Sequence, residues 1–343
     1  MAVSARDISN QYSEIDPEAT LPYEHSESRM QVGEYVCTLD EKSIKKAKKE
    51  LNEDPKERAG AVKALRDWVN QQQWLRFPTD DTVLLAILRV RKFSQLRARE
   101  MVESILTTKA KCSEWYIGND PTDPKAQKIW KEGVYVPLPR DKDGQRALLM
   151  RIGKMDPSGK SYTADEFIKA NAMVFDYLLM DENTQVNGLI FIIDLTGMDI
   201  KHTTFFGLAR NKKTTEALQK SVTARMKGIH YYNTGPIFES VFEVVKVFMS
   251  DKLRSRIHFH GQSLVSLYEK VDMSILPDEY LPDDYKGPSA GSVQDLITNY
   301  VEELNKPHIQ QWVKRMHSPE WGIDLSKKPN DEPQASFRKL NVS

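Results

Sequence analysis

The spacing of apolar residues changes along the chain and divides it into two regions. From Pro55 to about residue 117, apolar positions recur at helical intervals, so each segment presents one apolar face. The two clearest faces carry Ala61, Leu65, Trp68 and Val69, and then Leu84, Leu85, Leu88 and Val90. We therefore predict a small all-helical domain over residues 51–125.

From about residue 130, short apolar runs alternate with helical patterns. Residues 133–152 predict two strands joined by a turn at Asp143-Gly144, and residues 163–183 predict a helix capped by Thr163. The nearly continuous apolar run VNGLIFIIDLTG is typical of a strand buried on both faces. Further strands are predicted in MKGIHYYNT and RIHFHG. Strands that alternate with helices indicate an α/β sheet, which we place in residues 126–316.

The two ends of the chain lack such patterns. We expect residues 1–50 to form a polar N-terminal extension, ending in a lysine-rich helix with a solvated charged face, and residues 317–343 to form a disordered tail.

One predicted helix, residues 236–253, has an unusually wide apolar surface. Its polar positions form a single narrow stripe of Glu239, Glu243, Lys246 and Ser250, and nearly everything else is apolar. A helix that packs on one side only does not need so much apolar surface. Two interpretations remain open. The helix is enclosed between other elements, or one side faces an internal apolar cavity and the other can meet a membrane.

Composition narrows the class of protein. The 343 residues include 49 Lys+Arg and 49 Asp+Glu, so the chain is no general polycation and we expect no nucleic-acid partner. The only cysteines, Cys37 and Cys112, cannot build a disulfide framework. The N-terminus lacks the apolar core of a signal peptide, and no apolar run reaches the roughly 20 residues that span a bilayer. We expect a monomeric cytoplasmic protein that touches membranes only transiently.

Cations gather in sequence around the apolar helix 236–253. Arg225 and Lys227 precede the strand before it, and Lys246, Lys252 and Arg256 lie in or just after it. Arginine and lysine beside an apolar surface suit the phosphates of an anionic lipid headgroup.

Motifs for covalent or metal chemistry are weak. GPSAG, residues 287–291, matches the Gly-x-Ser-x-Gly of a hydrolase elbow, but polar LPDDYK precedes it instead of a buried strand. A serine hydrolase using Ser289 is therefore a remote alternative. His258 and His260 stand beside Arg254 and Arg256, which disfavour a bound cation, so we assign both histidines a structural role. We expect no catalytic residues, no metal and no cofactor.

Several stretches together resemble the CRAL-TRIO lipid-binding family, especially its tocopherol-transfer and retinaldehyde-binding members. They are LLAILRVRKFSQLRA, NGLIFIIDLTGM, RMKGIHYYNTGPIFESVFEVVKVFMSDKLRSRIHFHG and ILPDEYLPDDYKG, in the family's order, across about residues 55–316. The resemblance implies a helical N-terminal domain, then an α/β domain that encloses an apolar pocket under a mobile gate helix. It makes residues 236–253 that gate.

The resemblance also implies site residues and a function. The phosphoinositide-binding residues become Arg225, Lys227, Lys246, Lys252 and Arg256, with Arg91 or Arg89. The pocket residues become Phe167, Ala170, Val174, Leu189, Ile193, Thr214, Ala217, Phe238, Phe242 and Val245. Ala170 and Val174 stand where the tocopherol-transfer protein has serine. The implied function is transfer of a hydrophobic small molecule, such as a tocopherol, retinoid, carotenoid or sterol, between membranes. The alternative is a phosphoinositide-dependent adaptor without cargo.

Overall fold

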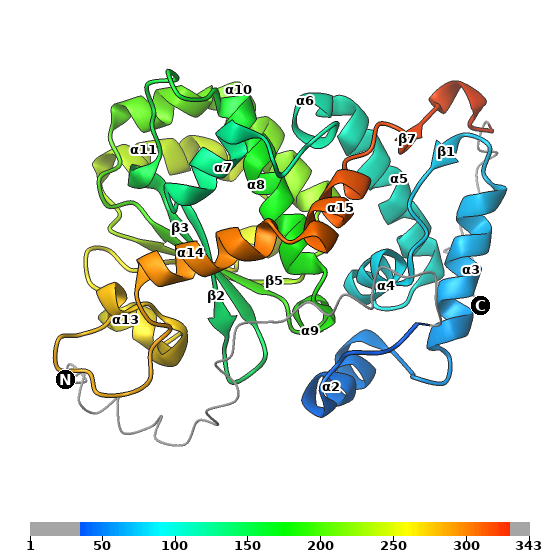
Figure 1. Cartoon of the computed structure of the whole chain (residues 1–343), viewed down its shortest axis with the longest axis horizontal. Helices are drawn as coiled ribbons and strands as arrows, with labels where there is room; N and C mark the ends of the chain where they lie inside the picture. The colour runs from blue at the N-terminus through cyan, green and yellow to red at the C-terminus, as the bar shows by residue number, and fades with distance from the viewer. Residues whose placement is uncertain (1–34, 330–343) are drawn as a thin grey trace, which may run out of the picture.

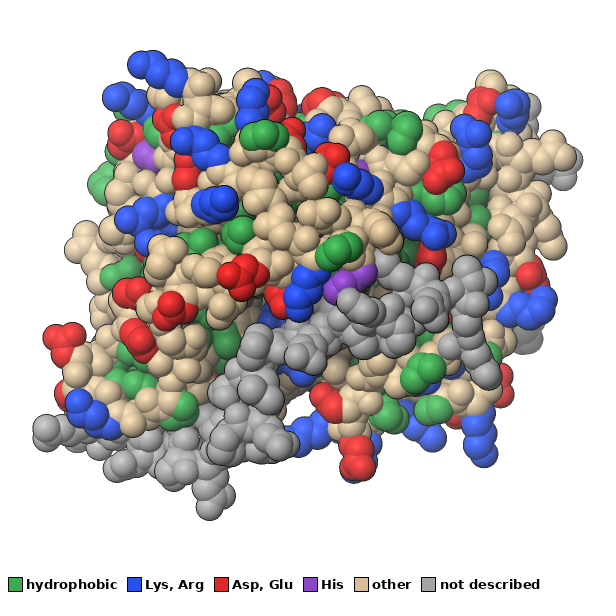
Figure 2. Space-filling model, in the orientation of Figure 1, with side chains coloured by type: hydrophobic (Ala, Val, Ile, Leu, Met, Phe, Trp, Pro, Cys, Tyr) green, Lys and Arg blue, Asp and Glu red, His purple; other side chains and the backbone are tan. Residues whose placement is uncertain are grey.

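The computed structural model describes residues 35–329, and two parts are visible in Figure 1. A mixed sheet flanked by helices occupies the left of the view, and a smaller helical unit occupies the right. The predicted fold class, a helical N-terminal domain followed by an α/β domain, is confirmed. Acidic and basic side chains are interspersed over the visible face of the molecule, as expected for a net charge of zero (Figure 2).

The α/β domain is built on a five-stranded sheet in the order β2-β3-β4-β5-β6. β2 and β3 pair antiparallel around a tight turn at Gly144, and β3 to β6 are parallel. The strands span Tyr135–Arg140 (β2), Arg146–Arg151 (β3), Leu189–Asp194 (β4), Met226–Tyr232 (β5) and Ile257–Phe259 (β6). Each parallel connection carries a helix, as a crossover between parallel strands requires.

Three helices from these crossovers lie over one face of the sheet. They are α8 (Ala164–Leu179), α10 (Ile200–Ser221) and α11 (Pro236–Val245). The α8 helix begins with the predicted capping box of Thr163 and Glu166, and α10 is kinked at Gly207, whose φ is 66°. Phe167 on α8 meets the ring of Tyr135 on β2, and Phe238 on α11 meets that of Tyr231 on β5.

The chain after β6 covers the opposite face. It does so through α13 (Val265–Tyr268), α14 (Val293–Leu304) and the single turns η5 (Met273–Ile275) and η6 (Asp278–Tyr280), whereas the last helix, α15 (Pro307–Met316), packs against α8. α14 packs against β2, and the Tyr280 hydroxyl donates to Asp194 at the end of β4. Alternate strand residues on this face, such as Leu149 and Ile192, are fully buried.

The helical unit is formed mainly by α3, α4 and α5, which share one apolar core. The bounds are Arg58–Gln71 (α3), Asp81–Val90 (α4) and Gln95–Lys111 (α5), followed by α6 (Ser113–Tyr116) and α7 (Pro124–Lys131). The predicted apolar residues Leu65, Val69, Leu84 and Leu88 are all buried. α9 (Glu182–Asn187), just before β4, contacts α4 and joins this unit to the sheet.

The described parts of the two chain ends, residues 35–50 and 317–329, make contacts that the expectation of a polar extension and a disordered tail did not include, and the rest of both predicted segments lies outside the described residues. Residues 35–40 lead into α2 (Glu41–Leu51), which packs on α9 through Leu39, Ala47 and Leu51. At the other end, β7 (Gly322–Ile323) pairs with β1 (Leu75–Arg76), and the turn η7 (Leu325–Lys327) follows. A few apolar residues placed on one side are enough to attach these segments, although their composition is polar.

The helix predicted over residues 236–253 is broken. α11 ends at Val245, a single 3-10 turn η4 (Lys246–Phe248) follows, and a separate short helix α12 (Asp251–Arg254) precedes β6. Met249 is extended, and the Ser250 side chain accepts the backbone N–H of Leu253 as the cap of α12. Ser250, the last residue of the polar stripe in the sequence, is therefore the N-cap of α12.

Candidate functional site

One row of side chains across the sheet is only partly covered by protein. Strand pairing places Tyr135, Met150, Ile193, Tyr231 and Phe259 side by side on the face beneath α8, α10 and α11. All five are half-buried or exposed, although the next row on the same face, which includes Leu148 and Phe191, is buried. The incomplete cover lies toward the carboxyl ends of the parallel strands.

Two tyrosines of this row, Tyr135 and Tyr231, are partly buried and partly uncovered. Burial raises the pKa of Tyr231 to about 12, and it also raises the pKa of Tyr135. In both tyrosines the cause is burial among protein atoms, which disfavours the charged phenolate. Yet part of each side chain is not covered by protein atoms.

Aromatic rings from the covering helices surround the row. Phe206 of α10 packs on Phe167 of α8, and Phe167 in turn meets Tyr135. At the other edge, Phe238 and Phe242 of α11 contact Tyr231 and the exposed ring of Phe259. The two aromatic groups leave the middle of the row, Met150 and Ile193, between them.

Most of the predicted pocket residues lie around this row. Phe167, Ala170 and Val174 are buried on α8, and Leu189 and Ile193 are on β4. Phe238, Phe242 and Val245 come from α11. Of the two α10 positions, the Thr214 hydroxyl donates to the Arg210 carbonyl, whereas Ala217 borders a separate polar groove of about 450 Å³ between α5 and α10. Ala217 is thus the predicted pocket residue that the structure places beside α5.

The outer side of α11 and of the following turn is apolar and uncovered. Ile237, Val244 and Val247 are 41%, 46% and 66% exposed. Ile200 and Leu208 of α10, which packs beside α11, are also exposed. Of the ten residues of α11, only Phe238 is buried. The wide apolar surface predicted for this helix is thus divided into one side that packs on the sheet and one side that is exposed to solvent.

A second feature is a cluster of cations at the amino-terminal ends of β5 and β6. Arg225 and Lys227 flank the start of β5, and Lys252 and Arg256 belong to α12 and the residues before β6. Burial, then the nearby Arg225, lowers the pKa of Lys227. Partial burial, then Arg256, Arg91, Lys92 and Arg225, lowers the pKa of Lys252. Mutual repulsion of this kind means that the cations share one small region.

The cluster contains one carboxylate, which sequence reasoning missed. Glu50, near the end of α2, accepts from Arg225 at 2.7 Å and lies 3.9 Å from the Lys227 ammonium. The hydrogen bond from Arg225 is the main cause that lowers the pKa of Glu50. Lys46, one turn earlier on α2, also repels Lys227. The lysine-rich stretch before residue 51 indicated a helix here. Its helical spacing does not show what α2 packs against, so the contact of Glu50 with Arg225 could not be predicted.

Backbone geometry brings the strand ends of the cluster close together. Gly188, just before β4, has a φ of 94°, and a Cβ there would lie 2.3 Å from the Arg225 carbonyl oxygen. The glycine therefore allows the chain carrying Arg225 to approach. After α4, Lys92 and Phe93 both adopt left-handed backbone angles, and the Asn52 side chain donates to the Lys92 carbonyl. This contact ties the end of α2 to the loop that carries Arg91 and Lys92.

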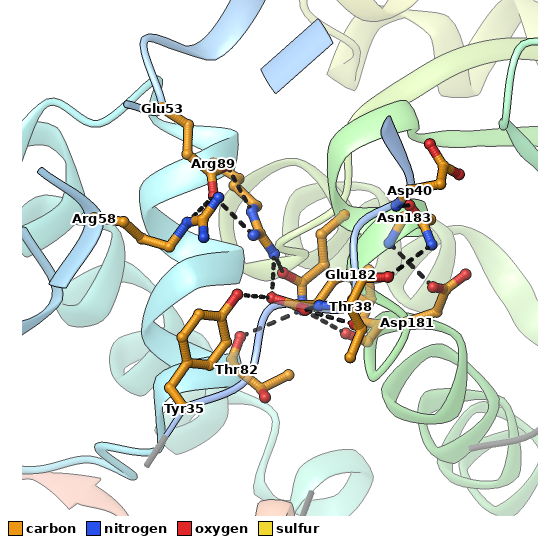
Figure 3. Close-up of polar contacts among 12 residues, drawn as sticks. Tyr35, Thr38, Asp40, Glu53, Arg58, Thr82, Arg89, Asp181, Glu182 and Asn183 are labelled. Carbon is orange, nitrogen blue, oxygen red and sulfur yellow. Dashed lines mark hydrogen bonds and ion pairs between the residues drawn. The ribbon is translucent and has the colours of Figure 1, made fainter. Parts of the chain in front are cut away.

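Two of the residues predicted to bind a headgroup, Arg89 and Lys246, are paired with carboxylates outside the cation cluster. Arg89 is fully buried at the junction of the two domains, bonded to Glu53 and Glu182 (Figure 3). It also donates to the side-chain oxygen of Gln185. It is inaccessible to a headgroup because its partners already surround it, so Arg91 is the better candidate from α4. Lys246 pairs at 2.5 Å with Glu243 on its own segment.

The remaining motifs do not form catalytic or metal sites. Ser289 donates to the Asp278 carboxylate and sits in a loop that no strand precedes, so the hydrolase elbow is absent there. His258 stacks on His230, which is 2.9 Å from His260 through ring nitrogens. Within residues 35–329 no group of three or more His, Cys, Asp or Glu side chains is arranged to hold a metal ion. Over the same range, no helix is both long and apolar enough to cross a bilayer.

Comparisons with known proteins agree with this architecture. Residues 131–280 match the CRAL/TRIO domain, and residues 54–126 match the Pinta-like UBA domain. The mouse protein "Alpha-tocopherol transfer protein-like" is 32% identical over 269 residues, covering 78% of this chain and 76% of its own length. Human Clavesin-2 is 29% identical over 244 residues, covering 71% of this chain and 74% of its own length.

Among solved structures, that of Sfh5 covers 78% of this chain and 98% of its own, with a TM-score of 0.43 and 12% identity. The resemblance inferred from the sequence is confirmed by the domain match and by the relatives. The chain belongs to the CRAL-TRIO family.

Proposed function

We propose that this protein binds one lipophilic small molecule beneath α8, α10 and α11 and transfers it between membranes. The observation that carries the proposal is the partly uncovered row Tyr135, Met150, Ile193, Tyr231 and Phe259. Tyrosines that are deeply desolvated and still uncovered in part are expected where a protein interior contains a hollow. The family's relatives, including one named for tocopherol transfer, support the same function.

In this proposal, the cargo is released when α11 moves away from the sheet. Its packing on the sheet is mainly aromatic, through Phe238 and Phe242, and its chain is interrupted at Met249 and Ser250. An apolar outer side that meets lipid acyl chains would lower the free energy of a displaced α11. Each Å² of apolar area removed from water contributes about 25 cal/mol, so insertion into lipid can offset the apolar burial that α11 gives up when it leaves the sheet.

In this proposal, the cation cluster binds the anionic headgroups of the target membrane. Arg225, Lys227, Lys252, Arg256 and Arg91 form the headgroup site, with Lys46 and Lys92 as neighbours. Several cations in one region favour the multiply charged phosphates of a phosphoinositide over a single negative charge. The protein acts as a monomer in the cytoplasm and visits the membrane only to load or release cargo.

The test is a vesicle transfer assay on the double variant Lys227→Glu/Lys252→Glu. Transfer to vesicles containing phosphatidylinositol bisphosphate should fall at least about tenfold, because each reversal replaces attraction by repulsion. Binding of cargo should not change. The matched control is Lys154→Glu/Lys160→Glu, which makes the same charge change at exposed positions near η3 (Ile152–Lys154).

Unchanged transfer by Lys227→Glu/Lys252→Glu would remove the headgroup site from the proposal. Vesicle binding without any extractable cargo would instead favour the adaptor.

A further inference from the structure

One buried amide on α8 is unexplained by the fold. Asn171 is 4% exposed, and within residues 35–329 neither its side-chain oxygen nor its nitrogen has a hydrogen-bond partner. Leaving a buried amide unpaired costs about 1–3 kcal/mol, so such groups usually have a reason to persist. Another buried asparagine, Asn187, differs in this respect because it donates to the Ser43 hydroxyl at 2.7 Å.

The position of Asn171 on α8 shows where its side chain lies. Asn171 follows Phe167 by four residues and precedes Phe175 by four, so it lies between them on the helix surface. Phe167 contacts Tyr135 on β2, and Phe175 contacts Phe191 on β4. Because β3 runs between β2 and β4, Asn171 is placed opposite β3.

The part of β3 that Asn171 faces is apolar. Strand pairing places Leu148 and Met150 on the side of the sheet that carries Tyr135 and Phe191. Val174 and Leu178, next along the same face of α8, are buried apolar residues. The buried amide of Asn171 is therefore placed opposite an apolar part of the sheet, between Phe167, which contacts Tyr135 of the partly uncovered row, and Phe175, which contacts Phe191 of the next row.

We infer that Asn171 is the polar contact for the cargo, and that the cargo is a lipid carrying an alcohol or phenol hydroxyl. This inference rests on the proposed carrier function. An amide offers a donor group and an acceptor side by side, and a hydroxyl can satisfy both through a single oxygen. An aldehyde or ester accepts but cannot donate, and a hydrocarbon leaves the amide unpaired.

The first arm of the test measures thermal stability of the delipidated protein. Asn171→Leu and Asn171→Ala should keep or raise Tm, by about 2–4 °C for the leucine variant, because they remove an unpaired buried amide. Asn187→Leu and Asn187→Ala are the matched controls, and both should lower Tm because they remove a hydrogen bond to Ser43. A loss of Tm in both Asn171 variants as large as in the controls would show a structural amide and overturn the inference.

The second arm compares 1-hexadecanol with hexadecane, two probes that differ by one hydroxyl. Wild type should retain the alcohol about tenfold more than the alkane, measured as bound probe by mass spectrometry. Asn171→Leu should abolish that preference and still bind the alkane.

Equal retention of the two probes by wild type would overturn the role of Asn171 and leave the carrier function standing. Failure of every protein to bind either probe would count against the carrier function itself and, with it, against a cargo contact of Asn171.

Discussion

At the scale of single residues, Glu50 is the most consequential side chain that the sequence did not single out. It places a carboxylate against Arg225 and Lys227, in the position that a phosphate takes in the proposed headgroup site. A bound headgroup must displace it or share its partners. A lipid with a single negative charge gains little electrostatic free energy when it replaces the Glu50 carboxylate, whereas a bisphosphate headgroup gains more.

Glu50→Gln tests this directly. Removing one negative charge from the cluster should raise affinity for vesicles containing phosphatidylserine by about fivefold, since a charge near a membrane is worth roughly 1 kcal/mol. Affinity for phosphatidylinositol bisphosphate should rise less, so discrimination between the two lipids should narrow. Flotation with labelled vesicles measures both. Glu41→Gln, at the other end of α2, is the control, and an equal effect from it would exclude a specific role for Glu50.

His230 is expected to contribute to the acid sensitivity of the protein. Burial, followed by the neighbouring His260 and His258, lowers its pKa to about 3. In the unfolded chain histidine binds a proton near pH 6.5, so between pH 6.5 and 3 the unfolded state holds more protons. Stability should therefore fall as the pH falls through this window, by up to about 1.4 kcal/mol per pH unit.

Replacing His230 by Phe should remove part of that slope. Urea denaturation at several pH values between 4 and 7 measures the free energy of unfolding, and His308→Gln on α15 is the control. A slope unchanged in His230→Phe would mean that other groups produce the acid sensitivity.

At the scale of elements, sequence periodicity predicted the core helices and strands well and failed where one residue decides a boundary. The strand 189–194 and the helix 164–179 follow from apolar pattern and the Thr163 cap. The break at Ser250 did not, because a serine in a polar stripe and a serine at a helix start look alike in sequence.

The candidate site was predicted unevenly for a related reason. The resemblance assigned pocket residues to α11 and β4 because those elements belong to strong local motifs, and these assignments stay predictions. Arg89 and Arg91, two positions apart at the end of α4, could not be separated by spacing, and only the partners Glu53 and Glu182 show which one is buried. Asn171 was missed because a buried polar residue breaks no pattern until its neighbours are known.

At the scale of the whole molecule, the segment before residue 51 connects the two domains. Glu182 on α9 accepts from Tyr35 and from both the backbone and the hydroxyl of Thr38, and it also pairs with Arg89 (Figure 3). Since α2 continues from this segment, the same contacts position Glu50 and Lys46 beside the cation cluster. The proposed headgroup site is therefore composed of parts from both domains.

Arg89→Met should accordingly destabilise the whole protein. It leaves Glu182 without its buried cation and Glu53 with Arg58 alone, and breaking a buried pair costs about 3–5 kcal/mol. Arg66→Met, which removes a partly exposed pair with Asp81, should cost no more than about 1 kcal/mol. Chemical denaturation compares the two, and similar small losses would show that the junction does not depend on Arg89.

The central claim is that a lipophilic molecule occupies the space beneath α11, and native mass spectrometry after exposure to a total lipid extract tests it most directly. The wild type should carry one lipid per chain. Ile193→Trp, which fills the middle of the uncovered row, should remain folded and carry none. A wild type that binds no lipid, or an Ile193→Trp variant that binds as much, would contradict the account.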